Sequence, residues 1–566
     1  DGSRDLIRKS IGKYVDFLYD AEGEYFATEG EKGTRPDYTS VLYPAKAVAM
    51  LRSGWHKDDL CAFISNDNGG SHGHRDDLSL DVTAFDKFLL VEAGGSAYSE
   101  GSEFAQRRFD TIYHNTIEID NKNQDMYAAT FPGGMELKSN DSFDLLWAGN
   151  TSIYKGFDVN RKVLMLKNKF LIVSDYIFAP DGPHTYRQAW HPDEDANLEL
   201  NKETGAAATH YAEGANIKII PADPEASEPV IFPRLISDNT EMYALQYARE
   251  NVEGDQTYDT VLYPEAIGED ASVSVSRLYL GDVPKTKATA LEIKIDDITG
   301  SYYSSNEEQF SVRRFGTYQY DGEMAYVETD DEGTLNYFAL TLGAELTDGE
   351  DILFRSEQPV RDLAVQYEGT GVRIFSSEDL PQGGISIAAP RRADKVYVNG
   401  TEVEYTLSDG KIVTKGEKKS DSSYEGIKPG SPGGQGKPTG NSGQGGTGVV
   451  PPTATPTPPP SEKTPLSDVD GHWAEEAIRS LYDKGIVSGD GQGRFWPERS
   501  VTRAEFTKLI VCAAGLPISN ESFAEFTDVA DGAWYAPYVA AANSLGIVSG
   551  FEDDTFRPNH FVTRQE

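Results

Sequence analysis

The sequence predicts a mainly β protein in which a large antiparallel β-sandwich follows the end of a helical domain and precedes a disordered linker and small α-helical modules. Three features predict this organisation. Short runs of alternating apolar and polar residues dominate the chain up to residue 414, a Gly-, Ser- and Pro-rich stretch follows, and a motif then recurs to the end. Aromatic residues make up 11% of the 566 residues, which suits broad pleated surfaces. A chain of this length predicts several folding units.

The first predicted element is a helix over residues Ser3 to Asp20. Ser3 suits its N-cap, and apolar side chains recur with helical spacing at Ile7, Ile11, Tyr14, Val15 and Leu18. One amphipathic helix cannot bury its apolar stripe alone. We therefore expect residues 1–50 to hold the end of a truncated helical domain and a connector, in a chain cut from a longer protein.

Strands are predicted from about residue 53 to residue 414. Period-two runs place Leu78, Leu80 and Val82 on one strand face, and Ile117 and Ile119 on another. Lys167 to Lys169 separates two apolar runs as a turn would, and Asn399-Gly400 and Asp409-Gly410 have the composition of hairpin turns. We expect a sandwich over residues 51–284, and its remaining strands with a β appendage over 285–414.

The composition changes at residues 415–465, which are rich in Gly, Ser and Pro and predict a linker because they cannot build a core. A pattern then recurs at a constant spacing, which predicts two copies of one small helical module, over 466–525 and 526–566. Matching positions are Trp473 and Trp534, Gly485 and Gly546, and Thr502-Arg503 and Thr563-Arg564. Thr502 to Glu505 has capping-box spacing, and the second copy stops at the equivalent cap.

The charge balance narrows the classes of partner. The chain has 92 Asp and Glu against 52 Lys and Arg, and the net charge of -40 disfavours nucleic acid and anionic lipid. A polyanionic substrate would need basic residues gathered in a cleft, and the candidates near the motifs below are Arg75, Lys87, Arg107, Arg108, Arg161 and Lys162. No apolar run approaches the ~18 residues that span a bilayer, so no membrane insertion is expected. The two cysteines fall in different predicted modules, which excludes a disulfide framework within either.

The densest candidate site is the Gly-rich segment from Gly69 to Asp76, which holds His72 and His74. In an extended segment, side chains two residues apart share a face and lie about 7 Å apart. Both imidazoles can therefore point into one site. The spacing does not decide whether both bind a metal, and two solvated loop histidines are the simpler alternative.

Two further groups are candidates for the same site. Glu92 ends an apolar run that starts at Phe88, and a carboxylate there is costly to bury unless it is paired or bound to a cation. His114 leads into the predicted strand from Ile117 to Ile119. His74, Glu92 and His114 could therefore converge from neighbouring strands as a two-histidine, one-carboxylate zinc set.

These motifs resemble the signature of the heparinase II/III-like C-terminal sandwich. The resemblance rests on Gly-x-His-x-His-x-Asp, an apolar strand that ends in an acid-x-Gly, the stretch from Arg108 to Thr116, and Arg52-Ser53-Gly54-Trp55. It covers residues 1 to about 414 and implies that the missing helical domain is an (α/α) toroid. One position departs from the family, which usually has Asp where this chain has Glu92.

The resemblance implies a lyase that cleaves uronic-acid polysaccharides by β-elimination. By that resemblance His72 is a catalytic histidine, and His74, Glu92 and His114 hold a structural zinc ion. Such a lyase must neutralise the C6 carboxylate, remove the C5 proton and stabilise the oxygen that leaves C4. A neutral imidazole near pH 7 suits the basic or neutralising role. The family completes its site with toroid residues, so we expect this chain alone to bind zinc and to turn over little substrate.

Tyr98 and Arg108 are weaker candidates for substrate contacts. Tyr98 is a candidate for stacking on a sugar ring, with an ordinary sandwich tyrosine as an equal alternative, and for Arg108 a solvated side chain is the simpler alternative. His184 and His191 are expected to be satisfied structural histidines.

The terminal repeats resemble S-layer homology (SLH) modules, which bind secondary cell-wall polysaccharide. On that resemblance Trp473, Arg503, Trp534 and Arg564 contact the wall glycan, and each arginine could pair with an acidic sugar substituent. The expected location is the cell surface of a Gram-positive bacterium, as a secreted protein bound to the wall or S-layer. The competing hypothesis is a non-catalytic glycan-binding or envelope protein with a lyase-derived sandwich. The sequence leaves open which uronate and linkage are cleaved and whether cleavage is endo or exo.

Overall fold

A computed structural model describes residues 38–417 apart from 67–73, 93–108, 126–133, 238–239, 308 and 390–391. Shorter stretches outside this range are also described, the longest being 32–36, 501–513, 526–530, 533–544 and 555–558. The chain divides into two units, Asp1–Gly426 and Ile427–Glu566. The helix predicted over Ser3 to Asp20 and nearly all of the predicted linker over 415–465 lie outside the described residues.

The first unit begins with a five-stranded antiparallel meander that carries the segments around the candidate site. Its strands are β1 (Val41–Tyr43), β2 (Val48–Arg52), β3 (Cys61–Ser65), β4 (Ser79–Ala84) and β5 (Lys87–Leu90). A four-stranded sheet has the order β15 (Glu228–Ser237), β16 (Thr240–Glu253), β11 (Pro183–Trp190) and β6 (Ile117–Ile119). Short 3-10 helices occur at η1 (Pro44–Lys46), η2 (Thr111–Tyr113) and η3 (Pro224–Ala226). The strands thus begin at Val41, within the range predicted for the helical remnant and its connector.

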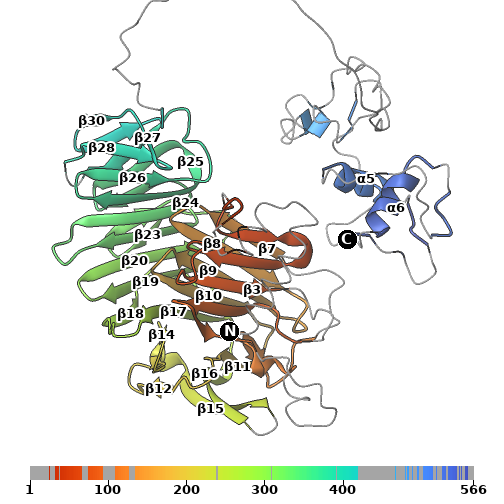
Figure 1. The fold of residues 1–566 in the computed structure, drawn as a ribbon, viewed down its shortest axis with the longest axis horizontal. Coiled ribbons are helices and arrows are strands. Elements are labelled where there is room, and N and C mark those ends of the chain that lie inside the picture. Colours follow the sequence, from red (N-terminus) through yellow and green to blue (C-terminus); the bar gives the residue numbers. More distant parts are fainter. Residues whose placement is uncertain are drawn as a thin grey trace, which may run out of the picture. The chain divides into compact units, whose positions relative to one another are not determined.

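Two larger sheets complete the unit (Figure 1). The eight-stranded sheet has the order β12 (Glu199–Leu200), β13 (Ala207–Ala208), β14 (Ala215–Pro221), β17 (Gln256–Ala266), β10 (Phe170–Phe178), β9 (Asp158–Leu166), β8 (Phe143–Asn150) and β7 (Gly134–Ser139). The main path of the fourteen-stranded sheet is β18 (Val273–Arg277), β19 (Ala288–Ile295), β20 (Ile298–Ser305), β23 (Met324–Thr329), β24 (Leu335–Asp348), β25 (Asp351–Glu368), β26 (Gly371–Phe375), β28 (Lys395–Val398) and β29 (Thr401–Glu402). Its side branches are β21 (Arg313–Phe315), β22 (Tyr318–Tyr320), β27 (Ile385–Ala388), β30 (Thr406–Ser408) and β31 (Lys411–Thr414). Because β18 already pairs with β19, this sheet begins before the predicted boundary at residue 285.

The eight-stranded sheet is buried on both faces, which explains the continuous apolar runs in β9 and β10. Val163 and Met165 pack into a core shared with the two smaller sheets, whereas Leu164 and Leu166 pack against the fourteen-stranded sheet. Successive side chains of a strand point to opposite faces, so burial on both faces requires apolar residues at successive positions. The predicted mainly β, antiparallel sandwich is confirmed, and in the described residues it is layered, with one central sheet.

The tight turns have the backbone conformations that the sequence predicts. Asn399 and Gly400 have φ of 46° and 78° between β28 and β29, and Asp409 and Gly410 have φ of 51° and 71° between β30 and β31. Two consecutive left-handed residues form the turn whose twist matches a tight hairpin, and Asn, Asp and Gly tolerate that conformation best. Asn168, with φ of 59°, makes the predicted break between β9 and β10.

In the second unit the described helices are α5 (Arg503–Ala513) and α6 (Ala536–Ser544). The predicted capping box opens α5, since the Glu505 backbone N–H donates to Thr502 Oγ1 at 3.3 Å and the Thr502 N–H donates to Glu505 Oε2 at 3.0 Å. Its second copy, from Thr563, lies outside the described residues.

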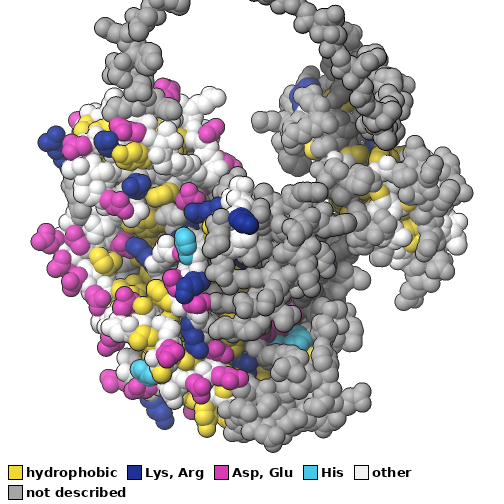
Figure 2. All heavy atoms as spheres, in the orientation of Figure 1, with side chains coloured by type: hydrophobic (Ala, Val, Ile, Leu, Met, Phe, Trp, Pro, Cys, Tyr) yellow, Lys and Arg dark blue, Asp and Glu magenta, His cyan; other side chains and the backbone are white. Residues whose placement is uncertain are grey.

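The described surface matches the acidic composition. In the first unit, acidic side chains are spread over the face drawn in Figure 2, among scattered Lys and Arg. Among the described residues, no helix combines the length and apolarity that crossing a membrane requires.

Candidate metal centre

Three potential metal ligands come together where the chain enters β4 and leaves η2. The rings of His74 and His114 have centroids 5.3 Å apart, and one donor atom from each of His74, Asp76 and His114 lies within 4.8 Å of the others. His74 and Asp76 lie two residues apart in the irregular segment before β4, and His114 follows η2 directly. The structure therefore brings together the two histidines that the sequence nominated as ligands. Metal binding itself stays a prediction.

Glu92, which the sequence predicts as the third ligand, lies beside this cluster. Its carboxylate contacts His114 Nδ1 through one oxygen and Ser79 Oγ through the other. Burial opposes ionisation of Glu92, but His114 and the Ser79 hydroxyl outweigh it and leave the pKa of this carboxyl below its ordinary value. Among the described residues, a carboxylate oxygen of Asp76 lies within 4.8 Å of a ring nitrogen of each histidine, while the Glu92 carboxylate contacts His114 and Ser79.

The second nitrogen of His114 supplies the test of whether a metal fits. The His114 side chain is fully buried, and its Nε2 has no hydrogen-bond partner among the described residues. A buried polar atom without a partner is costly unless something else binds it. A carboxylate on one ring nitrogen with the other left for a metal is a recurrent arrangement in zinc sites. Two imidazoles and a carboxylate also form a donor set that zinc accepts.

The two segments that carry the cluster are joined by a polar network that sequence reasoning missed. Asp77 N–H donates to Gln124 Oε1 at 2.9 Å, and its carbonyl accepts from Gln124 Nε2 at 3.1 Å and Thr116 Oγ1 at 2.7 Å. Thr111 Oγ1 donates to the Arg75 carbonyl at 3.0 Å. These hydrogen bonds satisfy backbone N–H and C=O groups of the irregular segments around Asp76 and His114. The two segments are therefore held together although no regular sheet joins them.

Arg234 on β15 is a second feature that the sequence analysis overlooked. It is 2% exposed, and its Nη2 donates to the Glu92 carbonyl at 3.2 Å. Nearby Asp81 is half-buried, and its removal from water raises the pKa of its carboxyl well above the ordinary value, with the neighbouring Glu92 charge adding to the effect. The sequence pattern could have indicated this buried arginine, because Arg234 is a lone charge that follows the apolar run Val230–Phe232.

Two of the basic residues that were candidates for a substrate cleft are buried inside the protein instead. Arg161 is fully buried and forms an ion pair with Asp175, and Lys162 is 3% exposed and donates to the Ser305 carbonyl at 2.7 Å. Neither can contact a substrate from there, so the expectation was wrong for both. Lys87 is paired with Asp193, at 3.3 Å.

The remaining predicted site residues divide into two groups. His72, Tyr98, Arg107, Arg108, Trp473 and Arg564 lie outside the described residues. In the second unit, Trp534 is 55% exposed, whereas Arg503 Nε donates to the Phe556 carbonyl at 2.9 Å and its guanidinium lies over the Phe556 ring. Arg503 therefore has a packing role between the two repeats, which the sequence analysis did not foresee.

The histidines expected to be structural differ from each other. His184 Nδ1 pairs with the Asp120 carboxylate at 3.1 Å, but its buried Nε2 has no hydrogen-bond partner among the described residues, so only one of its two nitrogens is satisfied as expected. His191 is fully buried against Phe232, and burial together with the nearby Arg234 charge holds its pKa well below the ordinary value. His191 is therefore neutral in the fold.

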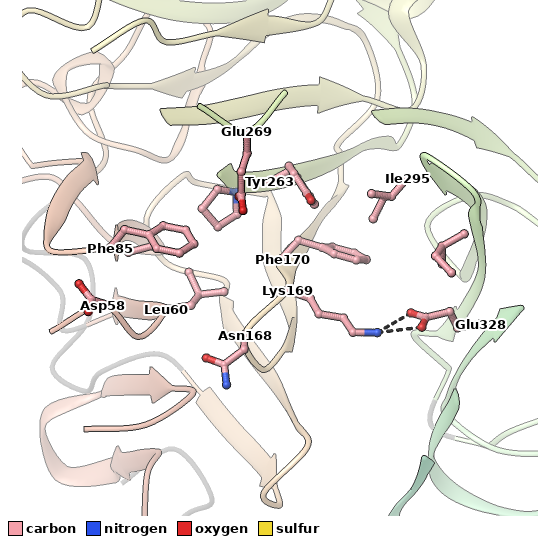
Figure 3. A pocket seen from close by; sticks show the side chains of 13 residues that line it. Asp58, Leu60, Phe85, Asn168, Lys169, Phe170, Tyr263, Glu269, Ile295 and Glu328 are labelled. Atoms are coloured by element: carbon pink, nitrogen blue, oxygen red, sulfur yellow. Dashed lines mark hydrogen bonds and ion pairs between the residues drawn. The ribbon is translucent and has the colours of Figure 1, made fainter. Parts of the chain in front are cut away.

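A separate pocket of about 370 Å³ opens at the other end of β3 and β4 from His74 (Figure 3). Residues from three sheets line it, among them Phe85, Phe170 and Tyr263. Lys169 spans it to Glu328 with two bonds of 2.8 and 2.7 Å, so these two charges satisfy each other. The pocket marks the junction of the sheets.

Family models match two parts of the chain. Residues 60–241 match the heparinase II/III-like, C-terminal model, and residues 465–507 and 525–566 each match the S-layer homology domain model. The first match contains His74, Asp76, Glu92, His114 and Arg234.

Curated relatives and solved structures add partial similarities. The chain is 36% identical over 132 residues to Exoglucanase XynX of Acetivibrio thermocellus, which covers 23% of this chain and 12% of that protein. It is 34% identical over 93 residues to an S-layer protein of Bacillus thuringiensis subsp. finitimus, covering 16% and 11% respectively. Among solved structures, heparan sulfate lyase HepC from Pedobacter heparinus aligns at 20% identity and a TM-score of 0.45, over 52% of this chain and 47% of that one. The chain thus spans a small part of these curated relatives and about half of the solved chain.

Proposed function

Because the chain carries a heparinase II/III-like C-terminal domain and two SLH domains, we propose that it is part of a cell-surface lyase that cleaves uronic-acid polysaccharide by β-elimination. The observation that carries the proposal is the cluster of His74, Asp76 and His114, in which His114 is fully buried and contacts Glu92 through Nδ1. A polysaccharide lyase needs imidazole and cationic groups at a fixed site, and this cluster supplies a rigid floor for one.

A zinc ion would be held by His74, Asp76 and His114. The unpartnered Nε2 of His114 supports this assignment, and Glu92 would fix the orientation of the His114 ring through Nδ1. The ion when bound supplies positive charge that keeps the two segments together. Every ligand is then a group that the described structure already brings into reach.

His72 is the proposed catalytic histidine. It precedes His74 by two residues, so an extended segment would place both imidazoles on one face. Its neutral ring would remove the C5 proton of the uronate or help to neutralise the C6 carboxylate. Tyr98 and Arg108 are proposed to contact the sugar ring and its acidic group.

The SLH domains are proposed to bind secondary cell-wall polysaccharide and so to hold the secreted protein on a Gram-positive cell surface. The exposed Trp534 supports a glycan contact, because an exposed indole offers a flat apolar face to a sugar ring. Trp473, Arg503 and Arg564 would complete the contacts.

The test is incubation of the full-length protein with heparan sulfate, chondroitin sulfate, hyaluronan and alginate while the ultraviolet absorbance of unsaturated uronate is followed. A rise with at least one polymer is expected. No rise with any of them, together with binding of the same polymers, would instead support the non-catalytic glycan-binding alternative.

A further inference from the structure

We propose that Arg161 is a positioning residue that holds the two ligand-bearing segments of the candidate metal centre in register. This inference rests on the proposed function, since it concerns the same site. Arg161 lies on β9 in the eight-stranded sheet, whereas His74, Asp76 and His114 belong to segments outside that sheet.

The contacts of the guanidinium define the role. Nη1 donates to the carbonyls of Leu78 and Asn115, at 2.6 Å each. Leu78 follows Asp76 by two residues, and Asn115 follows His114 directly. One nitrogen therefore bridges the backbone of both segments that supply the proposed ligands.

The other side of the guanidinium is fixed just as firmly. Nε and Nη2 donate to the two oxygens of Asp175, at 2.6 and 2.9 Å. Gln188 Nε2 donates to the same carboxylate at 2.7 Å, and Trp190 packs against the guanidinium, 5.5 Å from ring centroid to Cζ. The forked, planar group is thus held in one orientation by charged and polar partners.

Burial makes a purely stabilising role a poor explanation. Arg161 and Gln188 are fully buried and Asp175 is 1% exposed. Removing two charges from water costs about as much as their attraction returns, and apolar replacements of buried ion pairs are often neutral or stabilising. What an apolar pair cannot reproduce is the bridge to the Leu78 and Asn115 carbonyls.

The experiment compares two changes at this position with a matched arginine elsewhere. Arg161→Lys keeps the charge but cannot bond both carbonyls and both Asp175 oxygens with one ammonium. The double variant Arg161→Met with Asp175→Leu replaces the buried pair by apolar side chains and removes the bridge. The control is Arg277→Lys, because Arg277 is also partly buried and bonds two carboxylates, Asp223 and Asp259, neither next to a proposed ligand.

Zinc affinity is measured on the full chain by competition with a chromogenic chelator, and thermal unfolding is followed in parallel. Both Arg161 variants are expected to bind zinc about tenfold to a hundredfold more weakly, which is the usual loss when a group that orients metal ligands is removed. The double variant should show this loss even if its melting temperature is unchanged. Arg277→Lys should lower the melting temperature without lowering zinc affinity.

Hydrogen exchange of the metal-free protein separates this proposal from the metal proposal. The Arg161 variants are expected to exchange faster at Asp76–Ser79 and Thr111–Ile117, and the Arg277 variant is not. Unchanged exchange and affinity in the Arg161 variants, or an equal loss in the control, would overturn the positioning role. If the wild-type chain bound no zinc, the metal proposal would fail and the exchange comparison alone would decide the role of Arg161.

Discussion

The Glu92 carboxylate contacts Nδ1 of His114, and this contact leaves Nε2 of the same ring buried without a hydrogen-bond partner among the described residues. An imidazole held in this way presents one defined nitrogen to a metal. The relationship gives Glu92 and Asp76 separate roles, which substitutions can tell apart.

The first prediction concerns the two carboxylates. Asp76→Asn is expected to abolish stoichiometric zinc binding, because it removes a proposed ligand, whereas Glu92→Gln should weaken it by about tenfold to a hundredfold. Metal content by mass spectrometry and affinity by chelator competition measure both. Full zinc content in Asp76→Asn and none in Glu92→Gln would show that Glu92 is the ligand, as the sequence alone suggested.

The second prediction separates the two neighbouring histidines. In the full-length enzyme, His72→Ala should lower the rate of unsaturated uronate formation by at least about a hundredfold, since it removes the proposed acid-base group, and should leave zinc content intact. His74→Ala should lose zinc. Loss of metal in His72→Ala would mean that the roles of the two residues are exchanged.

The third prediction concerns pH and stability at Glu118 on β6. Burial, partly offset by Arg187, raises the pKa of this carboxyl from 4.5 to about 7. The folded chain therefore binds the proton more tightly than the unfolded chain, and this contribution to stability is lost as pH rises from 4.5 through about 7. Glu118→Gln should consequently stabilise the protein above pH 7, by about 1–3 kcal/mol, and have little effect below pH 4.5.

Thermal unfolding across this pH range checks the Glu118 prediction. Glu250→Gln is the matched control, because Glu250 is the more exposed of the two carboxylates on Arg187, and this variant should keep the wild-type fall in stability. A Glu118→Gln variant with the same pH profile as the wild type would contradict the assignment.

The fourth prediction concerns the capping box of α5. Thr502→Ala removes the hydroxyl that accepts from the Glu505 N–H and should destabilise this helix by about 1 kcal/mol. Thr502→Ser keeps the hydroxyl and serves as the control. Circular dichroism melting of the full chain measures both, and equal behaviour of the two variants would count against the cap.

The sequence predicted those features that depend on local chemistry. The turns at Asn399-Gly400 and Asp409-Gly410 and the Thr502–Glu505 box need only a few adjacent residues, and all appear as expected. The convergence of His74 and His114 was predicted from strand neighbours and a family resemblance. Asp76 was passed over as a ligand although, like His72, it lies two residues from His74.

Buried charges were the features that sequence reasoning misjudged. Arg161 and Asp175 lie opposite each other in the hairpin centred on Asn168, so the turn that was predicted also implied the pair. Arg161 was a candidate for a substrate cleft because amino-acid composition does not reveal which sheet faces are covered. The fourteen-stranded sheet, which buries the second face of β9 and β10, begins only at Val273, far beyond this hairpin in the chain.

The central claim is tested most directly by anomalous X-ray scattering at the zinc edge from crystals of the zinc-loaded chain. One anomalous peak is expected at about 2.0–2.2 Å from donor atoms of His74, Asp76 and His114, with Glu92 bonded to Nδ1 of His114. The absence of a peak near these three residues in protein that contains zinc would contradict the account.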